Sequence, residues 1–514
     1  MRQYETFELT FSGEPLQDRW ASVSLTAAFT YGGKTKTVKG FYDGGGQYKV
    51  RFLPDEPGEY HWKVSGVFSA EGKATCAPAQ GAHGPVRAEG TRFSYADGTP
   101  FLPFGTTVYA LASQDDALVD RTIAALQSAP FNKLRMCVFP KHYDYNHNEP
   151  PCFPFEKRPD GSWDTSRPHF ACWQRLEAIL DRIAALGVQI DLILFHPYDR
   201  WGFASLPQKG NLEYLDYLLR RLSAKPYIWW SLANEYDLCG SKTLKDWEEI
   251  EAFVAANDPF RHLLSSHNCF CFWDFSRKNV THCSIQTKAL TEIPRWLARY
   301  RKPVIIDECC YEGDLPHAWG SISGREMVYR FWRCVCSGGY CTHGETFLAG
   351  DDVLWWSKGG SLKGESAPRI AFLREIAESL PGPLEPWLTG WSGLGLMTPE
   401  QIREKLDAGY TPGDFTWLAL ASIARMEPGD RAAHLASEHT WRARCGENAF
   451  LQFFGLQTSA ACVFDLPQDK AYRAEMIDVW AMTRTTLLEN ISGKTTLRLP
   501  GREGIAVLIT QMEA

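Results

Sequence analysis

The chain has 514 residues, of which 44% are hydrophobic and 22% charged, and its 54 basic and 61 acidic side chains leave a formal net charge of −7. This composition is typical of globular domains and excludes a fibrous or largely disordered protein. Mild acidity without a Lys/Arg run argues against a nucleic-acid partner, and no apolar stretch approaches the ~20 residues that cross a membrane. The opening MRQYETFELTF lacks the apolar segment of a secretion signal, so we expect a cytoplasmic protein.

Fifteen cysteines are scattered through apolar segments of the chain. Their odd number and the expected cytoplasmic location predict that they are reduced and that most are buried. Cys334, Cys336, Cys341 and His343 have spacings that a zinc site could use, but residues two apart on a predicted helix point to different faces. We therefore predict no metal and no other cofactor, and keep a zinc-dependent hydrolase as the weakest alternative.

Residues 1–88 are predicted to form an immunoglobulin-like β-sandwich followed by a linker. Runs of alternating apolar and polar residues, each closed by glycine or proline, include FELTFSG, TKTVKGFYDGGG and EYHWKVSG. Short strands at this spacing are typical of an antiparallel sandwich. CAPAQGAHGPVRA, at residues 76–88, has the composition of a linker.

Between residues 89 and 385, strand-like runs alternate with segments of helical period. Eight strands are expected, at residues 101–109, 132–139, 189–195, 227–232, 262–267, 282–286, 303–307 and 340–345. An amphipathic helix is expected after each strand except the fifth, because residues 268–281 look irregular. This alternation predicts an α/β fold, and specifically a (β/α)8 TIM barrel.

Two further regions follow the predicted barrel. Residues 386–437 are expected to form a partly helical connector, in which Thr398-Pro399-Glu400-Gln401 looks like a capping box with proline at the first helical position. From residue 438 to 514, short alternating runs such as AFLQFFGL and GIAVLITQM return. They predict a second β-sandwich at the end of the chain.

Two glutamates stand where the fourth and seventh predicted barrel strands end. IWWSLANEYDL leads to Asn234 and Glu235, and KPVIIDECCYEG leads to Asp307 and Glu308. Barrel enzymes place their working groups at the carboxyl ends of the strands. The preceding runs are too apolar for solvent-facing strands, so these glutamates are expected in a site rather than on the surface. Two carboxylates across one barrel mouth are the arrangement that glycoside cleavage requires.

The asparagine-glutamate pair on strand four, together with a glutamate on strand seven, resembles the signature of clan A glycoside hydrolases, which are retaining (β/α)8 enzymes. Longer motifs are more specific, namely FNKLRMCVFPKHYDYNHNEPPCFPFE, DLILFHPYDRWGF, WWSLANEYDL, VIIDECCYEG and GGYCTHGETF. Together they resemble the apiosidase-like bacterial family, whose members carry an N-terminal sandwich and a C-terminal β-domain. The resemblance covers nearly the whole chain and is weakest at residues 390–437.

The resemblance implies that Glu235 is the general acid and base and that Glu308 is the nucleophile. If their carboxyls lie ~5 Å apart, as retention requires, the two charges repel by about 3 kcal/mol at an effective dielectric constant of ~20. We therefore expect Glu235 to keep its proton near neutrality while Glu308 is ionised. Once Glu308 has become an ester, Glu235 is expected to acidify and to deprotonate the attacking water.

Other polar and aromatic side chains at strand ends are expected to bind the sugar. Asn234 is expected to hydrogen-bond the hydroxyl next to the reacting carbon, and Arg135 to orient Glu308 or to form a structural ion pair. His142 and Tyr143, in the long loop after strand two, are expected to shape the subsite of the cleaved sugar. The remaining substrate-binding candidates are His196, Trp201, His267, Gln286, Glu345 and Trp355, of which the histidines have core positions as their alternative. Trp273, Trp319 and Trp356 also lie in loops after strands.

The predicted function is that of a retaining exo-acting β-glycosidase that removes a terminal sugar from a small plant-type glycoside or oligosaccharide, with an apiosidase as the first activity to test. Exo action follows from the long loops after strands two and five, which are expected to close one end of the cleft. The alternative is a non-catalytic carbohydrate-binding or scaffolding protein, although a binder has no need for two facing carboxylates. No membrane or nucleic-acid partner is expected, and a homo-oligomer is left open.

Overall fold

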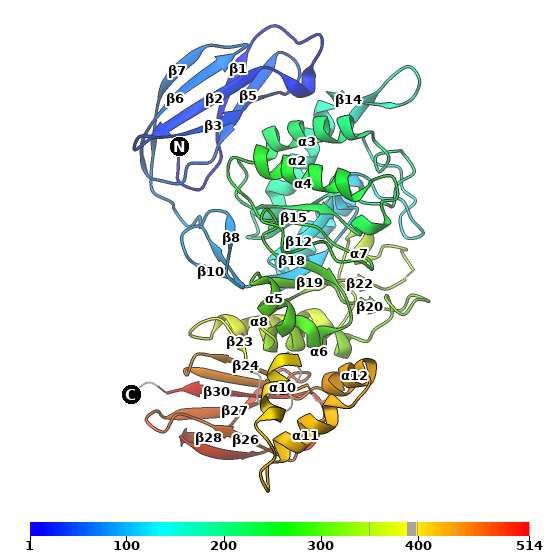
Figure 1. The fold of residues 1–514 in the computed structure, drawn as a ribbon. Coiled ribbons are helices and arrows are strands. Elements are labelled where there is room, and N and C mark those ends of the chain that lie inside the picture. Colours follow the sequence, from blue (N-terminus) through cyan, green and yellow to red (C-terminus); the bar gives the residue numbers. More distant parts are fainter. Residues whose placement is uncertain (349, 388–396, 398, 438, 513–514) are drawn as a thin grey trace. The chain divides into compact units, whose positions relative to one another are not determined.

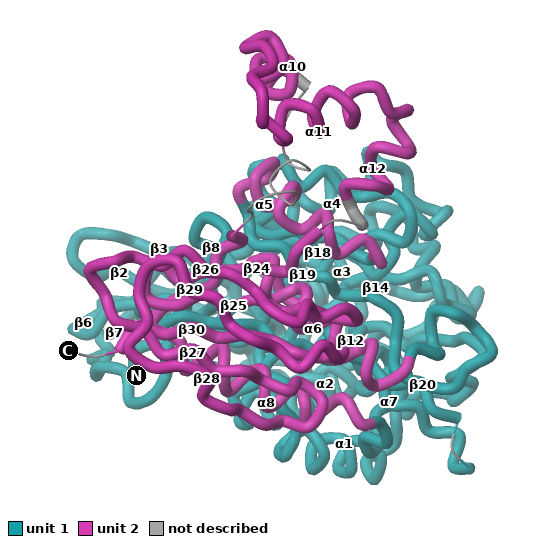
Figure 2. The backbone as a smooth tube through the Cα atoms, turned by 90° about the horizontal axis from the view of Figure 1, so that it is seen from below, with its two compact units in different colours: residues 1–286, 302–322, 342–364 teal, residues 287–301, 323–341, 365–514 magenta. Residues whose placement is uncertain are grey.

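The computed structural model describes residues 1–348, 350–387, 397, 399–437 and 439–512, and Figure 1 shows its fold. These residues divide into two compact units, which Figure 2 colours separately. The first comprises residues 1–286, 302–322 and 342–364, and the second comprises residues 287–301, 323–341 and 365–514. The first unit therefore holds the N-terminal strands and most of the barrel, and the second holds the C-terminal strands together with three helices that follow barrel strands.

The N-terminal domain has two antiparallel sheets around one core, as predicted. Their strand orders are β3-β2-β6-β7 and β1-β5-β4. The strands are β1 (Phe7–Ser12), β2 (Leu25–Tyr31), β3 (Lys34–Lys39), β4 (Phe41–Tyr42), β5 (Gln47–Phe52), β6 (Gly58–Gly66) and β7 (Ala70–Cys76). Because successive side chains of a strand point to opposite faces, Leu25, Ala27 and Phe29 of β2 all enter the core. Phe29 stacks on Phe52 of the other sheet, with ring centroids 4.0 Å apart.

Eight parallel strands form a nearly closed barrel, which confirms the predicted (β/α)8 fold. Their order is β17-β16-β15-β12-β11-β21-β19-β18, and a bridge between His267 and Ser284 connects the two ends. The strands are β11 (Phe104–Thr107), β12 (Lys133–Cys137), β15 (Gln189–Phe195), β16 (Ile228–Ala233), β17 (Leu264–Ser265), β18 (Cys283–Gln286), β19 (Val304–Glu308) and β21 (Tyr340–His343). Every residue of β15 and β16 is buried, which explains why these strands read as continuous apolar runs.

Helices follow the barrel strands in the expected places. They are α1 (Asp116–Ser128), α2 (Phe170–Ala184), α3 (Gln208–Leu222), α4 (Leu244–Asn257), α5 (Ile293–Tyr300), α6 (Gly324–Cys336), the short α7 (Trp355–Lys358) and α8 (Ser366–Glu378). Residues 266–282 are all described and form no helix, as predicted. Side-chain caps begin α1 and α4, where Asp115 accepts the backbone N–H of Leu118 and Thr243 accepts that of Asp246.

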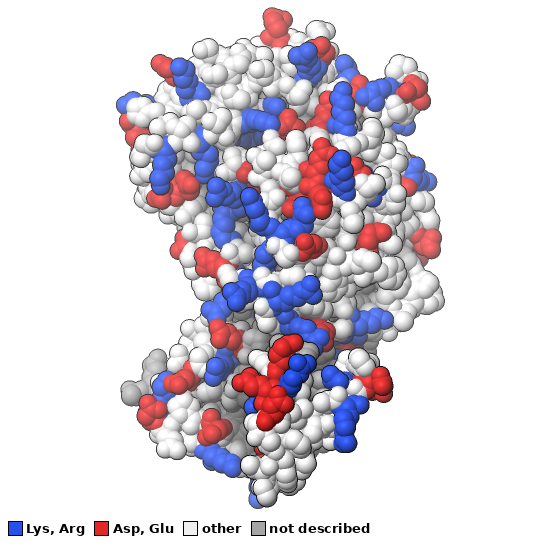
Figure 3. All heavy atoms as spheres, viewed as in Figure 1, with Lys and Arg blue, Asp and Glu red and all other residues white. Residues whose placement is uncertain are grey.

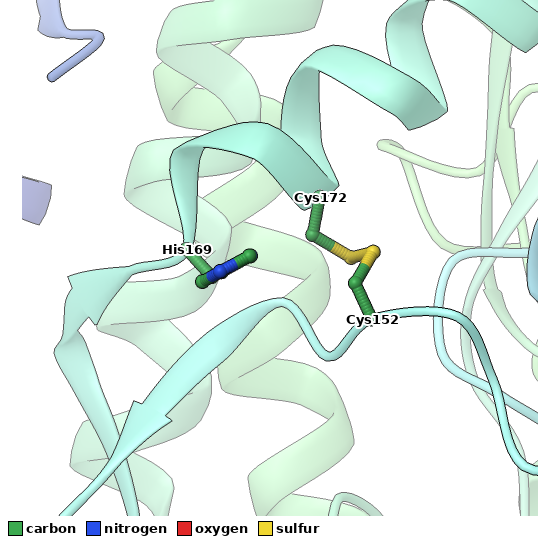
Figure 4. Close-up of side chains that lie close together, drawn as sticks. All are labelled: Cys152, His169 and Cys172. Carbon is green, nitrogen blue, oxygen red and sulfur yellow. A yellow bond between two sulfur atoms is a disulfide. The ribbon is translucent and has the colours of Figure 1, made fainter.

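The loop after β12 is long and folds back onto the start of α2. It contains the hairpin β13 (Phe155–Lys157) and β14 (Trp163–Pro168), and Cys152 in this loop forms a disulfide with Cys172 of α2 (Figure 4). The expectation that the cysteines are reduced is wrong for this pair, because the folded loop brings two residues 20 apart in sequence to a Cα–Cα distance of 5.6 Å. Most of the other cysteines are buried, as expected.

The C-terminal domain also has two antiparallel sheets, so the second sandwich is confirmed. The larger has the order β23-β24-β25-β30-β27-β28, and β26 pairs with β29. Phe464, Tyr472 and Val507 lie in the core that both sheets share, and Trp332 of α6 packs on Phe453 at 5.7 Å between ring centroids. The strands are β23 (Glu385–Pro386), β24 (Trp441–Cys445), β25 (Ala449–Phe453), β26 (Ala461–Asp465), β27 (Tyr472–Asp478), β28 (Thr483–Ile491), β29 (Lys494–Arg498) and β30 (Ile505–Gln511).

Three helices precede β24, namely α10 (Pro399–Asp407), α11 (Phe415–Ala424) and α12 (Pro428–Ser437). Helix α10 begins at the proline that the sequence placed at the first helical position, whereas Thr398 of the predicted capping box lies outside the described residues. Among the helices of the described chain, none is long and apolar enough to cross a membrane. On the face drawn in Figure 3, basic and acidic side chains are interspersed.

Candidate active site

Two buried glutamates face one another through a single amide at the carboxyl ends of the barrel strands. Glu235 follows β16 and Glu308 ends β19, with exposed fractions of 6% and 9%. Gln286 ends β18, and with its amide nitrogen facing the carboxylates it donates to Glu308 Oε2 at 3.2 Å and to Glu235 Oε1 at 3.2 Å. Since both oxygens lie at that distance from one nitrogen, they are no more than twice that distance apart.

Donor groups surround the Glu308 carboxylate. The hydroxyl of Tyr109, which follows β11, donates to Glu308 Oε1, and Arg135 Nη1 donates to the Tyr109 oxygen at 3.2 Å. Arg135 Nη1 also lies 3.6 Å from Glu308 Oε1. His267 Nε2 is 3.8 Å from the same oxygen. Arg135 therefore contacts this carboxylate directly and through Tyr109. Its Nε also lies 3.4 Å from Asp191 Oδ2 and 3.8 Å from Asp307 Oδ1, the structural ion pair that the sequence left as the alternative.

The Glu235 carboxylate has a different set of partners. Its Oε2 accepts from the Tyr198 hydroxyl and from Asn234 Nδ2, the latter at 3.2 Å. The backbone N–H of Glu235 donates to His267 Nδ1 at 3.4 Å, which leaves the ring proton on Nε2, the nitrogen that faces Glu308. Glu235 has a φ of 51°, a left-handed conformation that ends β16 and turns the chain into the next 3-10 turn.

Burial and the neighbouring Glu235 carboxylate raise the pKa of Glu308 to about 7. The sequence led us to expect the retained proton on Glu235, whereas the raised pKa of Glu308 assigns it to the pair that the two carboxyls form. Two carboxyls so close titrate as a pair, so the pair holds one proton up to about pH 7.

A layer of buried charges lies beneath the two glutamates inside the barrel. Lys133 Nζ contacts Asp307 Oδ1 at 2.7 Å and Asp191 Oδ2 at 2.8 Å. Asp307 also accepts from Ser284 Oγ at 2.6 Å and from Thr342 Oγ1 at 2.7 Å. Although burial opposes ionisation, Lys133 and Arg135 hold the pKa of Asp307 far below its usual value. Asp307 therefore stays a charged support for the cations beneath the site rather than a reacting group.

Lys141 lies beside the pair in a cage of aromatic rings. Its ammonium nitrogen is 3.7 Å from the centroid of the Tyr109 ring, 4.2 Å from that of Tyr198 and 4.6 Å from that of Tyr143. The side chain is 1% exposed. Burial lowers the pKa of Lys141, while the charges of Glu235 and Glu308 oppose that shift. The lysine thus places a positive charge beside the two glutamates, held by ring faces through cation–π attraction.

The structure brings several predicted site residues together and places others elsewhere. At least one of the two glutamates is contacted by each of Asn234, Arg135, His267 and Gln286. Tyr143 is half-buried and packs against Tyr198 and Trp356. His142 is half-buried, and its backbone N–H donates to the Tyr198 carbonyl at 2.9 Å.

Three other candidates make their contacts away from the two glutamates. His196 is a core histidine whose Nε2 lies 3.2 Å from the Phe139 carbonyl, and burial together with the Lys141 charge lowers its pKa to about 3. Trp355 is 1% exposed and donates its indole N–H to Thr106 Oγ1 at 2.8 Å. Glu345 belongs to a separate buried cluster with Glu312 and His343.

Trp201 lies in the loop after β15 and donates its indole N–H to Glu149 Oε2 at 3.1 Å. It lines a pocket of about 530 Å³ together with Trp163, Thr165 and Lys209. The remaining tryptophans that were expected in loops include Trp356, which lies in α7, and Trp319. Both pack near Tyr145, with ring centroids 5.8 and 6.0 Å away. Trp273 is buried and donates to Glu251.

Sequence reasoning missed the tyrosines that hold the two carboxylates. Tyr109, Tyr198 and Tyr311 each come shortly after a barrel strand. Tyr109 and Tyr198 donate to the carboxylates, while burial and the Glu308 charge raise the pKa of Tyr311. Their position just past the strand ends was a usable signal, although buried tyrosines are common in any core. Among the described residues, no group of metal-ligating side chains contains Cys334, Cys336 or Cys341, the cysteines of the weakest alternative.

Comparison with known proteins gives the following matches. Residues 87–382 match a family described as apiosidase-like, catalytic domain. Residues 1–66 and 438–510 match two families described only as domains of unknown function, DUF5060 and DUF5605. No curated protein matches the chain.

Solved structures with the same fold include one that aligns along the whole chain. A candidate glycoside hydrolase from Bacteroides vulgatus ATCC 8482 is 33% identical, covers 99% of this chain and 99% of its own, and has a TM-score of 0.85. A glycoside hydrolase family 5 protein from the same organism is 15% identical over 84% of this chain and 93% of its own, with a TM-score of 0.58. At that identity the second likeness concerns the fold alone.

Proposed function

Because the chain belongs to the apiosidase-like family of glycoside hydrolases, we propose that it is a retaining, exo-acting β-glycosidase that removes a terminal sugar from a small glycoside or oligosaccharide. Apiose-containing plant glycosides are the first substrate class to test. The observation that supports this proposal best is the Gln286 amide, which donates to Glu235 and Glu308 at 3.2 Å each. It joins the two carboxylates into one reacting pair.

The separation of the carboxylates favours retention over inversion. Inverting glycosidases keep their carboxyls roughly 6.5–9.5 Å apart to leave room for a water, whereas retaining enzymes keep them about 5 Å apart. One amide nitrogen 3.2 Å from both Glu235 Oε1 and Glu308 Oε2 keeps these oxygens within twice that distance, which is just below the inverting range. Glu308 is therefore proposed as the nucleophile rather than as the base that activates a water.

In the proposed reaction the pair holds one proton while substrate is bound. With that proton on Glu235, the carboxyl protonates the departing glycosidic oxygen as Glu308 forms a bond to the anomeric carbon. The resulting glycosyl ester carries no charge, so Glu235, now ionised, removes a proton from water as the water breaks the ester. Both glutamates return to their starting state, and the anomeric configuration is retained.

The loops around the pocket support exo action. The loop after β12 runs from residue 138 to 169, contains its own hairpin and is tied to α2 by the Cys152–Cys172 disulfide. His142 and Tyr143 lie in this loop, and Tyr143 packs against Tyr198, which holds Glu235. A long loop fixed in this way is suited to closing one end of a cleft.

A glycoside screen with identification of the released sugar and its first-formed anomer tests the proposal. Wild-type protein is expected to release a monosaccharide in its β form from aryl or plant β-glycosides. Glu308→Ala and Glu235→Ala are expected to lose at least about 1,000-fold in kcat/KM, since each removes a group that bonds or protonates the substrate.

Azide is expected to restore turnover of Glu308→Gly with an inverted product. The control is Glu248→Ala, which removes an exposed carboxylate of α4 that pairs with Arg277 and is expected to leave activity unchanged. Binding of glycosides without release would favour the non-catalytic alternative. Normal turnover by either catalytic variant would remove the proposed mechanism.

A further inference from the structure

A second cluster of buried ligand-type side chains lies apart from the two proposed catalytic glutamates. Glu312 of β20 (Glu312–Gly313), His343 of β21 and Glu345 of β22 (Glu345–Thr346) are 2%, 0% and 1% exposed. Each offers one ligand atom, and these atoms all lie within 4.8 Å of one another. Strands β20 and β22 pair in parallel, with Glu312 opposite Glu345, so the backbone itself brings the two carboxylates together.

Two polar atoms in this cluster face one another without a hydrogen bond. His343 Nε2 and Glu345 Oε1 are both buried and have no hydrogen-bond partner. They are 3.6 Å apart, which is too long for a hydrogen bond. A buried polar atom without a hydrogen bond costs roughly 1–3 kcal/mol, so an ion placed between these two atoms would be stabilised by both.

The other atoms of these side chains are held by the surrounding structure. Glu345 Oε2 accepts the backbone N–H of Lys363 at 2.6 Å. His343 Nδ1 lies 3.2 Å from Thr106 Oγ1, which also accepts the indole N–H of Trp355 at 2.8 Å. Metal-ligating histidines are oriented in this way, with one ring nitrogen bonded to a supporting group and the other left for the ion.

The carboxylate of Glu312 packs closely against the backbone of Gly364. A Cβ atom on Gly364 would lie 2.5 Å from Glu312 Oε2 and 2.6 Å from Oε1. A larger residue there would force this carboxylate to move, so the backbone at residue 364 restricts its position. Because both carboxylates are buried, a cation between them would be stabilised by both.

We propose that Glu312, His343 and Glu345 bind one divalent cation of the zinc or manganese type. Such ions take imidazole nitrogen and carboxylate oxygen together, whereas calcium and magnesium favour oxygen ligands alone. At metal–ligand distances of about 2.1 Å, two ligands of a tetrahedral ion lie roughly 3.4 Å apart. The 3.6 Å between His343 Nε2 and Glu345 Oε1 is close to that value.

The cation would have a structural role. It would connect β20 to β22 only four residues after Glu308. Double displacement by two glutamates needs no metal, so this ion would fix the position of the segment that carries the nucleophile without joining the reaction.

Metal analysis of the purified full-length protein tests the site directly. Wild-type protein is expected to carry about one equivalent of zinc or manganese, and a chelator is expected to lower its Tm by about 5 °C or more, with recovery when the metal alone is added back. Glu345→Gln and His343→Asn are expected to lose both the equivalent and the Tm response.

The control is Cys152→Ser, because Cys152, His169 and Cys172 form the other metal-type cluster of the described residues. This variant is expected to keep the metal. Loss of the metal in Cys152→Ser would assign it to that cluster and overturn the proposal. A metal-free wild-type protein whose Tm does not respond to zinc or manganese would also overturn it and would leave protonated His343 as the partner of the two carboxylates.

Discussion

At the scale of single residues, the two glutamates differ in the groups that hold them. The carboxylate of Glu308 is contacted by Tyr109, Arg135 and Gln286. That of Glu235 is contacted by Tyr198, Asn234 and the same Gln286. Arg135 lies 3.6 Å from Glu308. Its charge and the Tyr109 hydrogen bond lower the pKa of Glu308 and so oppose the effects of burial and of Glu235.

The pH dependence of activity follows from the proton that the pair retains. Since burial and Glu235 raise the pKa of Glu308 to about 7, the singly protonated pair is expected to persist up to about pH 7 and to be lost above it. We predict that kcat/KM falls as pH rises beyond about 7, and that Glu235→Gln removes this alkaline limb. Initial rates with an aryl glycoside from pH 4 to pH 10 measure it. An activity that rises through pH 7 and stays high in alkali would contradict the prediction.

A second residue-level prediction concerns stability. The pKa of Glu308 is 4.5 in its ordinary state and about 7 in the folded protein. The folded protein therefore loses stability as pH rises between these two values, and the loss is complete above about pH 7. Glu308→Gln is therefore expected to be more stable than wild type by about 1–3 kcal/mol at pH 8, with the difference shrinking towards pH 5. Urea unfolding at the two pH values measures it. Equal stabilisation at both values would show that the charge is not the cause.

At the scale of elements, the loop after β17 supports Gln286. Asp237 accepts three backbone N–H groups of this loop, from Cys269 at 2.7 Å, Phe270 at 2.7 Å and Cys271 at 2.8 Å. The preceding Asn268 bonds both backbone groups of Gln286, at 3.1 Å and 3.2 Å. Asp237 therefore acts on the bridging amide through a chain of contacts and is a positioning residue.

Removal of Asp237 is expected to affect turnover more than binding. Asp237→Ala frees three amide donors, so we predict a loss of about 10-fold or more in kcat with a smaller change in KM, because a misplaced Gln286 no longer holds the two carboxylates in register. Asp237→Asn keeps one acceptor oxygen and should be intermediate. The control is Asp274→Ala, which removes a local turn bond to Ser276 in the same segment. Equal kcat losses in both variants would contradict the proposed path.

At the scale of the molecule, a buried ion network joins the N-terminal domain to the barrel. Glu177 of α2 accepts from Arg51 of β5 at 2.8 Å and from Arg221 of α3 at 2.8 Å. Although burial opposes ionisation, Arg221 and Arg51 lower the pKa of Glu177. The three side chains are nearly inaccessible, and without Glu177 only Glu8 would remain to Arg51 and only Asp43 to Arg221.

Glu177→Gln is expected to destabilise the protein by about 3 kcal/mol, because two buried arginines lose their shared counter-charge. The control is Glu59→Gln, which removes an exposed ion pair with Lys73 and is expected to leave unfolding unchanged. Because the folded-state pKa of Glu177 is lowered, its stabilisation is present at neutral pH and is lost as the protein is acidified. Thermal unfolding at pH 7 distinguishes the two variants. A shift no larger than that of Glu59→Gln would show that the network does not hold the domains together.

Pairs of similar residues show that the sequence did not predict the direction of side chains just past the strands. His196 and His267 both follow apolar strands, yet His196 turns into the core towards Phe139 and His267 faces Glu308. Trp355 is bonded to Thr106, while Trp356 lies beside the lysine cage. The direction of a side chain just past a strand depends on the twist and register of the neighbouring strands, which its own sequence does not specify.

The amino-acid order alone determined the eight-stranded barrel between two sandwiches and the positions of Glu235 and Glu308 at strand ends, because apolar periodicity and turn residues act over a few neighbours. Only the folded chain decided that Gln286 joins those carboxylates, that Tyr109 and Lys141 enclose them, and that Cys152 reaches Cys172. Such contacts connect residues far apart in the chain. They arise when strands close into a barrel, so no local pattern records them.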